Sequence, residues 1–408
     1  MLQNLKTRNQ RKTPKRSKNN TKKIPQFCGI FFDLYRAIPL LSVVEVCNSG
    51  KVFVGKTLHP KRNTMNSFSK KLTILVVLSM VLFSCDNKGA KMQTISGKSG
   101  EVVVVIGKET WKGQTGSLIR EVLAQPHASL PQEEPMFNLI DVPPEAFINL
   151  FKSSRNILTV KISPTFTEPK VEFTNDTWAY PQAVVNIQAS SPENFRELFE
   201  ANGDKIMSYY LKAEKDRLKT TYLDAHEKAV YNTLLKELKI KMYVPTGFNI
   251  VKQDSNFAWI RYDTPMITQN ILIYTYPYDS DSIFTLNYQR IKRNLITRKN
   301  VPGPLPGSYM TTEMELPLDF NILKHNGNYA SEMRGLWKVE NDFMGGPFVS
   351  LSVLDGSRRR IVTVEGNVYA PKNTKRNYLR QVEAMIYSLE FPSQKINDKI
   401  TKQLESGN

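Results

Sequence analysis

Residues 101–107 read EVVVVIG, and this short stretch is the strongest secondary-structure signal in the sequence. It is β-branched through its centre and bounded by Gly100 and Gly107, which is typical of a buried strand. An amphipathic helix follows from Gly113, and further patterns indicate strands at 137–142, 157–162 and 183–187 and a short helix at 144–151. This βαβαββ order places the region in the α+β class.

A long helical segment follows at residues 192–239, and we expect it to break at Asn202-Gly203. After the break, apolar and aromatic residues recur at helical spacing from Ile206 to Leu238. About 35 residues at 1.5 Å per residue make a helix of roughly 50 Å, longer than one small domain needs. We therefore expect this helix to join two domains.

The second half has the patterns of another α+β domain. We predict two α/β-sandwich domains with mainly antiparallel sheets, at residues 99–240 and 241–392, joined by the long helix and followed by a polar tail at 393–408. The elements predicted in the second half are strands at 242–251, 257–262, 271–276, 329–340, 348–354 and 361–369, a helix at 282–298 capped by Asp281 or Ser282, and a closing helix at 374–389.

An apolar run at residues 72–83, LTILVVLSMVLF, follows Lys70-Lys71 and ends at Ser84-Cys85. A basic start, an apolar centre and a small residue before the cleavage point are the three parts of a secretory signal. The run has 12 residues, whereas a helix that spans a bilayer needs about 20. We predict a signal peptide at 65–84, cleaved between Ser84 and Cys85, and a flexible tether at 85–98.

The last four residues, Leu82-Phe83-Ser84-Cys85, resemble the lipobox of bacterial lipoproteins. In that family the cysteine becomes the first mature residue and carries acyl chains, so the resemblance implies that Cys85 is lipidated, with palmitate or a similar fatty acid. Two or more acyl chains hold a protein stably on a bilayer. The alternative is a plain signal anchor in which the cysteine is incidental.

The basic charge of the chain is concentrated at its front. Residues 1–64 hold 14 Lys and Arg against Asp33 and Glu45, and Lys70 and Lys71 add two charges, so a formal net charge of +18 falls to +4 for residues 85–408. Nucleic-acid binding by the folded part thereby loses its main support. If Met65 is the start, residues 1–64 are a mis-assigned, disordered extension. The alternative is a basic arm that touches anionic lipid or nucleic acid.

The residues after Cys85 are poorly supplied with catalytic side chains. They include no cysteine, and their histidines are His127, His226 and His325. This composition excludes a disulfide framework, a thiolate zinc site and a cysteine nucleophile in that part. The Gly-x-Ser-x-Gly and His-Glu-x-x-His motifs are also absent. The sequence favours a protein without metal, cofactor or enzymatic activity.

Several segments rich in turn residues recur along the chain: WKGQTG (111–116), LPQEEPMF (130–137), RNI (155–157), DTWAYPQ (176–182), VPGP (301–304), GSYMTTE (307–313), GLW (335–337), GGPF (345–348) and EGNVYAP (365–371). Together they resemble a Bacteroidetes-type family of lipoproteins defined only by a domain of unknown function. The resemblance covers residues 100–391 and implies an envelope location, without an activity or a catalytic residue. The second half also resembles the PsbP/Mog1-like sandwich in the order of its elements.

Two pairs of glutamates are candidates for catalysis. Glu133 and Glu134, with Glu313 and Glu315, would supply the two carboxylates of a glycosidase if the fold brought them together. Solvated acidic loops are the alternative reading.

A second group of residues is the candidate partner-binding surface: Trp111, Trp178, Trp337, Arg358, Arg359 and Arg360. The tryptophans lie in segments rich in Gly, Pro or aromatic residues, where exposed aromatic side chains anchor partners. The arginines follow the Asp355-Gly356 turn and would grip a phosphate or an acidic glycan. Core packing and a solvated hairpin tip are the alternatives.

We therefore expect a lipid-anchored cell-envelope protein, on the periplasmic or surface face of the outer membrane, that binds or assembles a protein or glycan partner without catalysis. The membrane is its second partner, through the acyl chains on Cys85, and nucleic acid is not expected. The alternative is an envelope hydrolase that acts on glycan or peptide.

Overall fold

The computed structural model describes residues 92–392. The extension at 1–64, the signal peptide at 65–84, Cys85 and the tail at 393–408 lie outside the described residues. We call residues 92–224 the N-terminal half and residues 225–392 the C-terminal half.

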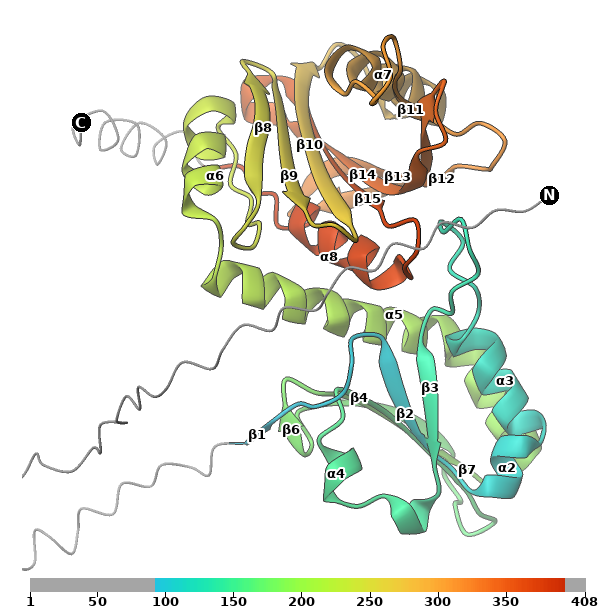
Figure 1. The fold of residues 1–408 in the computed structure, drawn as a ribbon. Helices are drawn as coiled ribbons and strands as arrows, with labels where there is room; N and C mark the ends of the chain where they lie inside the picture. Colours follow the sequence, from blue (N-terminus) through green and yellow to red (C-terminus); the bar gives the residue numbers. More distant parts are fainter. Residues whose placement is uncertain (1–91, 393–408) are drawn as a thin grey trace, which may run out of the picture. The chain divides into compact units, whose positions relative to one another are not determined.

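The N-terminal half has an α/β layer structure (Figure 1). Within the described residues its main sheet has five strands in the order β3-β2-β4-β7-β5. The β2–β3, β2–β4 and β4–β7 pairings are parallel, and only β5–β7 is antiparallel. Its elements are β1 (Gln93–Thr94), β2 (Glu101–Val105), α2 (Lys108–Lys112), α3 (Gln114–Leu123), β3 (Asn138–Val142), η1 (Pro144–Ala146), α4 (Asn149–Lys152), β4 (Asn156–Ile162), β5 (Lys170–Asn175), β6 (Ala179–Tyr180), β7 (Ala183–Ala189) and α5 (Pro192–Asp224).

The two faces of this sheet are covered unequally. On one face, Val102 and Val104 pack with apolar side chains of α3 and α5, such as Ile119 and Phe195. On the other face a small cluster that includes Val103 and Val105 is covered by Phe147, Phe151 and Trp178. The run EVVVVIG is thus apolar on both faces because both faces of β2 are buried, as is typical of parallel sheets.

Helix α5 connects the two halves. Its 33 residues run without interruption from Pro192 to Asp224, and it packs against α3 and β7 of the N-terminal half and against α8 (Arg376–Ile386) of the C-terminal half (Figure 1). The predicted bridging helix is therefore present. Its predicted break at Asn202-Gly203 is wrong: Gly203 lies within the helix against Val122, where a Cβ atom would be in tight contact at 3.3 Å. The helix ends at Asp224, with Ala225 as its C-cap, and does not continue to Leu238 as predicted.

The start of α5 is capped by Ser191, whose side-chain oxygen accepts a hydrogen bond from the Asn194 backbone N–H at 3.2 Å. Replacing Ser191 with alanine removes this acceptor, and we expect the free energy of unfolding to fall by about 1 kcal/mol. Urea unfolding of the wild type and of Ser191→Ala measures the loss. The neighbouring Ser190→Ala change is the control: it removes a long hydrogen bond to Asn194 Oδ1, at 3.4 Å, and leaves the Ser191 cap in place. An unchanged midpoint in Ser191→Ala would show that the cap contributes nothing.

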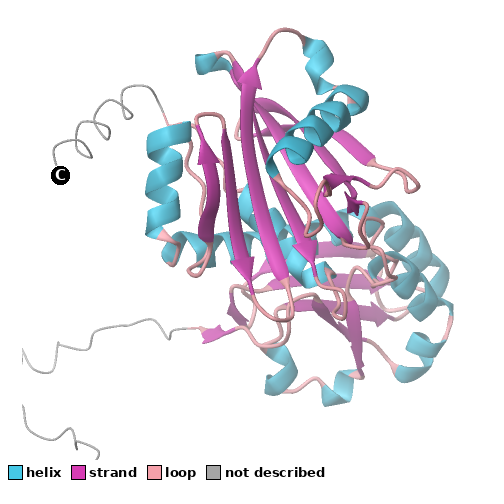
Figure 2. Ribbon diagram, turned by 45° about the horizontal axis from the view of Figure 1, so that its top comes forward, coloured by secondary structure: helices cyan, strands magenta, loops and turns pink. Residues whose placement is uncertain are grey.

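The C-terminal half is built on an antiparallel sheet. Within the described residues this sheet has eight strands in the order β11-β13-β14-β15-β10-β9-β8, with β12 paired to β13. Figure 2 shows α7 lying across the long strands. The elements are α6 (Lys228–Thr233), a π-helical turn η2 (Leu234–Leu238), β8 (Asn249–Asp254), β9 (Phe257–Asp263), β10 (Thr268–Pro277), η3 (Asp281–Phe284), α7 (Leu286–Asn300), β11 (Tyr309–Thr312), β12 (Asp319–His325), β13 (Asn328–Glu340), β14 (Gly345–Asp355), η4 (Gly356–Arg358), β15 (Arg360–Tyr369) and α8.

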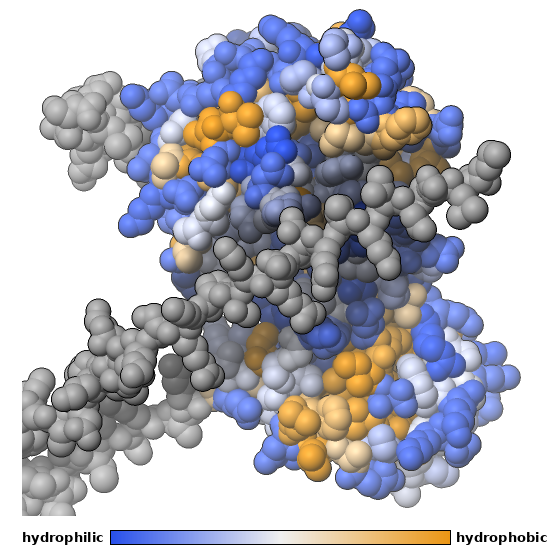
Figure 3. All heavy atoms as spheres, viewed as in Figure 1, coloured by the Kyte–Doolittle hydropathy of each residue, from blue (hydrophilic) through white to orange (hydrophobic). Residues whose placement is uncertain are grey.

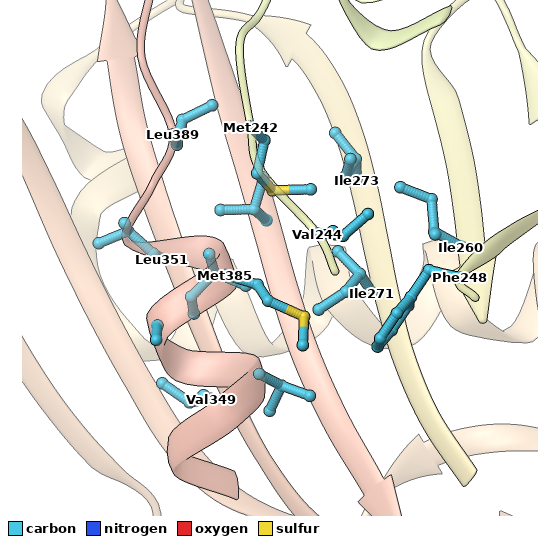
Figure 4. Close-up of a cluster of buried hydrophobic side chains, with 14 of the residues drawn as sticks. Met242, Val244, Phe248, Ile260, Ile271, Ile273, Val349, Leu351, Met385 and Leu389 are labelled. Carbon is cyan, nitrogen blue, oxygen red and sulfur yellow. The ribbon is translucent and has the colours of Figure 1, made fainter. Parts of the chain in front are cut away.

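Helix α8 closes one face of the eight-stranded sheet with an apolar core. Met385 and Leu389 meet Ile271 and Ile273 of β10 and Leu351 of β14 in this cluster (Figure 4). The opposite face, under α7, combines apolar and polar groups. Arg293 of α7 and Glu365 of β15 are both fully buried there and form a two-bond ion pair at 2.7 and 2.8 Å.

The mixed α+β class and the arrangement in two halves are confirmed. Mainly antiparallel pairing holds for the eight-stranded sheet but is wrong for the five-stranded sheet. In a β-α-β unit the crossover helix returns the chain to the end of the sheet at which the first strand began. The two strands of the unit therefore run parallel. The cap of the helix predicted at 282–298 is also wrong, since Thr285 caps α7 and Asp281 and Ser282 lie in η3. The tether predicted at 85–98 is already paired to β6 at Gln93 and Thr94.

Candidate functional site

A cleft lies along α5, between this helix and the β12–β13 hairpin, with α8 and the loop at residues 127–136 completing its wall. Its volume is about 840 Å³, within the usual size range of ligand sites. We call it the charged cleft. Among the described residues that line it, the ionisable ones are His127, Lys212, Glu214, Lys215, Asp216, Lys219, Asp319, Lys324, His325, Glu332, Arg334, Arg380, Glu383 and Tyr387.

The inner wall of the cleft is a connected ion-pair network. Arg334 of β13 donates two hydrogen bonds to Glu332, at 2.7 and 2.8 Å, and contacts Glu383 of α8 at 3.0 Å. Lys215 of α5 reaches the same Glu383 oxygen at 2.9 Å. The Tyr387 hydroxyl donates to Glu332 at 2.6 Å, and the Lys215 ammonium lies 3.9 Å from the centre of its ring. Side chains from three elements therefore hold one another in place.

The network fixes the charges of its members. Burial alone would raise the pKa of Glu383, but the Arg334 and Lys215 cations hold it far below its usual value. Burial opposes the charge of Arg334 too, yet Glu383 and Glu332 keep its pKa well above the usual value. Burial and the neighbouring Glu332 raise the pKa of the Tyr387 hydroxyl. Glu383 is therefore ionised and Tyr387 neutral at physiological pH, which makes this wall a fixed pattern of charges.

A second network joins α5 to the N-terminal half. Glu214, 1% exposed, accepts two hydrogen bonds from Arg155, at 2.8 and 2.9 Å, and one from Arg217 at 3.0 Å. Asn156 and Ser99 donate to it as well, at 2.8 and 2.9 Å. Burial acts to raise the pKa of Glu214, but the two arginines outweigh it and lower the pKa. This carboxylate is saturated with donors and has a structural role.

Arg380 of α8 is the cleft residue with the least complete set of partners. It is 5% exposed, and its Nη2 donates to the Met136 carbonyl at 2.6 Å. Its Nε and Nη1 atoms have no hydrogen-bond partner among the residues that the structure describes. Burial, and then the neighbouring Arg376, lower its pKa to about 10, so it is still a cation at neutral pH. Both atoms are fully buried, and Nη1 lies beside Gly100, so they are not open to a ligand in the cleft.

The N-terminus of α8 is tied to the N-terminal half by Glu134. Both oxygens of this buried carboxylate accept backbone N–H groups of α8, from Lys375 at 2.6 Å and from Arg376 at 3.0 Å. The Arg376 and Arg380 guanidinium groups lie so close to Gly100, at φ +79°, that a Cβ atom there would come within 2.9 Å of each. The cleft floor is thus positioned by contacts that join residues more than 200 positions apart in sequence.

His127 and His325 line the cleft in their neutral form. Burial lowers the pKa of His127 to about 4, with Arg334 and Arg380 adding to the effect. Burial also lowers the pKa of His325, whose Nε2 donates to the Leu389 carbonyl at 2.8 Å. Neither histidine therefore carries charge in the cleft near neutral pH.

The depressed pKa of His127 makes stability dependent on pH. In the unfolded chain His127 is protonated near pH 6.5, whereas in the folded protein it is protonated only near pH 4. The contribution of His127 to the free energy of unfolding is therefore fully present above pH 6.5. It falls progressively toward pH 4, because the unfolded state binds more protons in that interval. We expect His127→Gln to lose less of its urea midpoint than the wild type between about pH 7.5 and about pH 5. Equal losses in both proteins would contradict this role of His127.

The structure does not gather the tryptophans predicted for the partner-binding surface. Trp111 lies in α2 under the Arg120 guanidinium, and Trp178 packs edge-on against Phe147 at 5.4 Å between ring centroids. Trp337 is 3% exposed in the core under α7 and so cannot form part of a surface. Each belongs to a different apolar cluster, so core packing explains Trp337, and the three do not form one site.

The arginines of the predicted surface are mostly engaged within the hairpin. Arg358 and Arg360 both contact the buried Asp355 carboxylate, at 3.2 and 3.0 Å. Arg359, with φ 49°, is exposed at the turn. Of the three arginines in this described turn, Arg359 is therefore the one whose side chain is available to bind an external anion.

The glutamates predicted for hydrolysis have separate roles. Glu134 caps α8 as described, and Glu133 is exposed beside it. Glu313 pairs with Lys338 at 3.4 Å and accepts the Glu315 backbone N–H at 3.0 Å, which lowers its pKa, while Glu315 is exposed. No contact joins the two pairs within residues 92–392.

The last features concern the proposed cleavage and lipidation positions, metal binding and membrane-spanning helices. Ser84 and Cys85, the proposed cleavage and lipidation positions, lie outside the described residues. Within the described part, three or more His, Cys, Asp or Glu side chains nowhere gather in a way that would hold a metal ion. No helix of residues 92–392 combines the length and the apolar character that a membrane span requires.

Sequence reasoning missed the charged cleft. Its key residues, Lys215, Arg334, Arg380 and Glu383, have no motif spacing, and they come from three elements. A weak signal was present in α8, where Arg376, Arg380 and Glu383 stand at i, i+4 and i+7 and so share one face of the helix. Charged residues at buried positions of a helix indicate partners elsewhere in the fold.

Comparison with protein families divides the chain at the end of α5. Residues 95–223 match the family described as "Domain of unknown function (DUF8532)", and residues 227–388 match "Domain of unknown function (DUF4837)". No curated protein matches the chain.

Solved structures give weak likenesses. The Saccharomyces cerevisiae Ran-binding protein Mog1p is 11% identical over 39% of this chain and 93% of its own, with a TM-score of 0.26. A mutant of protein Mog1 is 10% identical over 39% and 94%, with a TM-score of 0.26. LpqN, involved in cell envelope biogenesis of Mycobacterium tuberculosis, is 16% identical over 36% and 79%, with a TM-score of 0.24. The chain thus combines two neighbouring regions that each match a domain of unknown function, and its likeness to Mog1 is weak.

Proposed function

We propose that this chain is a lipid-anchored cell-envelope protein that binds a protein or glycan partner in the charged cleft, without catalysis. The anchor is proposed from the lipobox-like segment that ends at Cys85. The envelope location, at the outer membrane, is proposed from that segment together with the resemblance of residues 100–391 to a Bacteroidetes-type family of lipoproteins. The binding role is proposed from the geometry of the cleft.

One observation carries the binding role: the cleft has the size of a ligand site, and the carboxylates of its inner wall are neutralised by fixed cations. Glu383 and Glu332 share Arg334, and Glu214 is saturated by Arg155 and Arg217. A general acid or base needs a pKa near the working pH. The pKa values of Glu383 and Glu214 are both lowered. The cleft therefore suits recognition by fixed charges better than proton transfer.

The same geometry indicates the chemistry of the ligand. The rim of the cleft carries exposed or half-buried polar groups such as Lys219, Asn321 and Lys324. Hydrogen-bond acceptors of a ligand would meet these side-chain donors along the rim of the cleft. We expect the bound segment to be polar and to present an anionic group to Lys219 and Lys324.

Site-specific photo-cross-linking in the native envelope tests this function. A photoreactive phenylalanine analogue replaces Asn321, exposed on the cleft rim, or Asn287, exposed on α7 and outside the cleft. We expect a discrete adduct from position 321 and none from position 287. Digestion of the adduct with protease or with glycosidase tells a protein partner from a glycan.

Charge reversal supplies the control for this experiment. Lys219→Glu together with Lys324→Glu changes two rim residues that have no part in the inner ion-pair network, and it should reduce the adduct while leaving the protein folded. Adducts of equal yield from positions 321 and 287, or an adduct that survives the charge reversal unchanged, would contradict the proposed function of the cleft.

A further inference from the structure

The N-terminal half has an exposed surface around α4 that is apolar, in contrast to the charged cleft. We call it the α4 face and define it by Ile140, Phe147, Ile148, Leu150, Trp178 and Tyr180. Leu150 is 69% exposed, Tyr180 60% and Ile148 59%. Figure 3 shows hydrophobic side chains gathered where Figure 1 draws α4 and β3. Soluble monomers rarely expose a contiguous apolar patch without a function.

The α4 face is continuous because its members pack on one side of the five-stranded sheet. Phe147 and Trp178 are in edge contact, and both cover the cluster of Val103, Val105 and Val142. Ile140 precedes Val142 by two positions in β3, so both side chains point to this side of the sheet. The helices α3 and α5 cover the other side, whereas this side is covered, among the described residues, by Phe147, Phe151 of α4 and Trp178.

The chain joins the domain next to this face. Gln93 and Thr94 pair with Ala179 and Tyr180 of β6. Ile95 donates its backbone N–H to the Tyr180 carbonyl at 3.1 Å, and Ser96 donates to the Ser153 carbonyl, at the end of α4, at 2.7 Å. The first described residues are therefore hydrogen-bonded to the two segments that present Leu150 and Tyr180.

The proposed anchor lies a short distance along the chain from that point. Six residues lie between Cys85 and Met92, and a fully extended chain over that interval spans at most about 25 Å. An acylated Cys85 would sit at the surface of the bilayer. The side of the protein where the chain joins the domain must then stay within that distance of the lipid.

We propose that the α4 face lies against the bilayer surface and inserts Ile148 and Leu150 into its interfacial region. This inference rests on the proposed lipid anchor at Cys85. Aliphatic side chains bind the boundary between headgroups and acyl chains, and Trp and Tyr favour the same depth. Glu145 is exposed beside the face, so apolar contact drives the docking and anionic lipids are not needed. The bilayer is favoured over a second copy of the chain because the short tether already brings lipid to this face.

Fluorescence quenching in vesicles tests the docking. Residues 86–408 contain no cysteine, and acylation consumes the Cys85 thiol, so one added cysteine in the acylated protein is a unique labelling site. Leu150→Cys carries the label on the α4 face. Leu295→Cys is a matched control, a leucine that is 61% exposed on α7. Both proteins are reconstituted in phosphatidylcholine vesicles and labelled with an environment-sensitive fluorophore.

The expected result is loss of fluorescence at position 150 when a doxyl-labelled phosphatidylcholine is added, with no loss at position 295. Palmitate incorporation is measured on both proteins. If palmitate is incorporated but neither label is quenched by the lipid, the docking is overturned and the anchor stands. If the label at 150 is shielded from both the doxyl lipid and aqueous iodide, a protein covers the face and the inference is wrong. If palmitate is not incorporated, the anchor fails and this inference with it.

Discussion

Replacing Glu365 with leucine is expected to lower the free energy of unfolding by about 3–5 kcal/mol, the usual cost of removing one partner of a buried ion pair. Glu365 and Arg293 are both fully buried under α7. After the change, Arg293 keeps its hydrogen bond to Thr312 at 2.9 Å and its position 4.0 Å from the centre of the Phe348 ring. Neither contact neutralises the guanidinium charge, so the cation is left uncompensated in the core.

The reverse single change and the double change separate the pair energy from the cost of an orphaned charge. Arg293→Met should also destabilise, since it leaves the carboxylate without its cation. The double variant Arg293→Met with Glu365→Leu buries no charge, and it should lose less than either single variant. Urea unfolding followed by tryptophan fluorescence measures all three. Glu315→Leu, at an exposed position, is the control and should change by less than about 0.5 kcal/mol.

A double variant that loses the sum of the two single losses would contradict this explanation. Such additivity would mean that Arg293 and Glu365 stabilise the core independently, through packing alone.

Replacing Glu214 with leucine is the second large effect, again about 3–5 kcal/mol. Its carboxylate is the shared acceptor of Arg155 and Arg217, which are largely buried themselves. Removal leaves two cations close together without an anion, and it also removes the acceptor for Asn156 and Ser99. Because the lost contacts join α5 to β4 and to the segment before β2, we expect the N-terminal half to loosen first.

Hydrogen exchange locates this effect, and urea unfolding gives its size. In Glu214→Leu, exchange should accelerate in β2 and β4 more than in β14 and β15. Glu200→Leu is the matched control, since Glu200 is exposed on the same helix. Uniform acceleration over both halves would show that Glu214 supports the whole described fold rather than its N-terminal half.

Local sequence patterns predicted many of the helices and strands, but they did not predict how the strands pair. EVVVVIG predicted β2 correctly because consecutive β-branched residues between glycines leave little choice of conformation. The bridging helix was predicted by its periodic apolar residues, but Asn202-Gly203 was over-weighted: tertiary contact of Gly203 with Val122 overrides its low helix propensity. Strand β5 was missed because KVEFTN is a largely exposed edge strand with little apolar signal.

The candidate site was beyond sequence reasoning because its contacts are long-range. Glu134 meets the start of α8 more than 200 residues later, and Lys215 meets Glu383 from a different element. Such pairs leave no spacing that a single sequence displays. Conversely, Trp337 was predicted at the surface because its segment is rich in Gly and aromatic residues. It is buried instead, in a place where a Cβ atom on Gly346 would come within 3.2 Å of the Trp337 ring nitrogen.

The mass of the N-terminal peptide, measured on protein purified from native membranes, tests the proposed lipid anchor most directly, and that anchor would fix both the location of the cleft and the orientation of the α4 face. The proposal predicts a mature chain that begins at Cys85, with acyl chains on its sulfur and its amine. A peptide that contains any residue before Cys85, or a Cys85 with a free thiol, would contradict it.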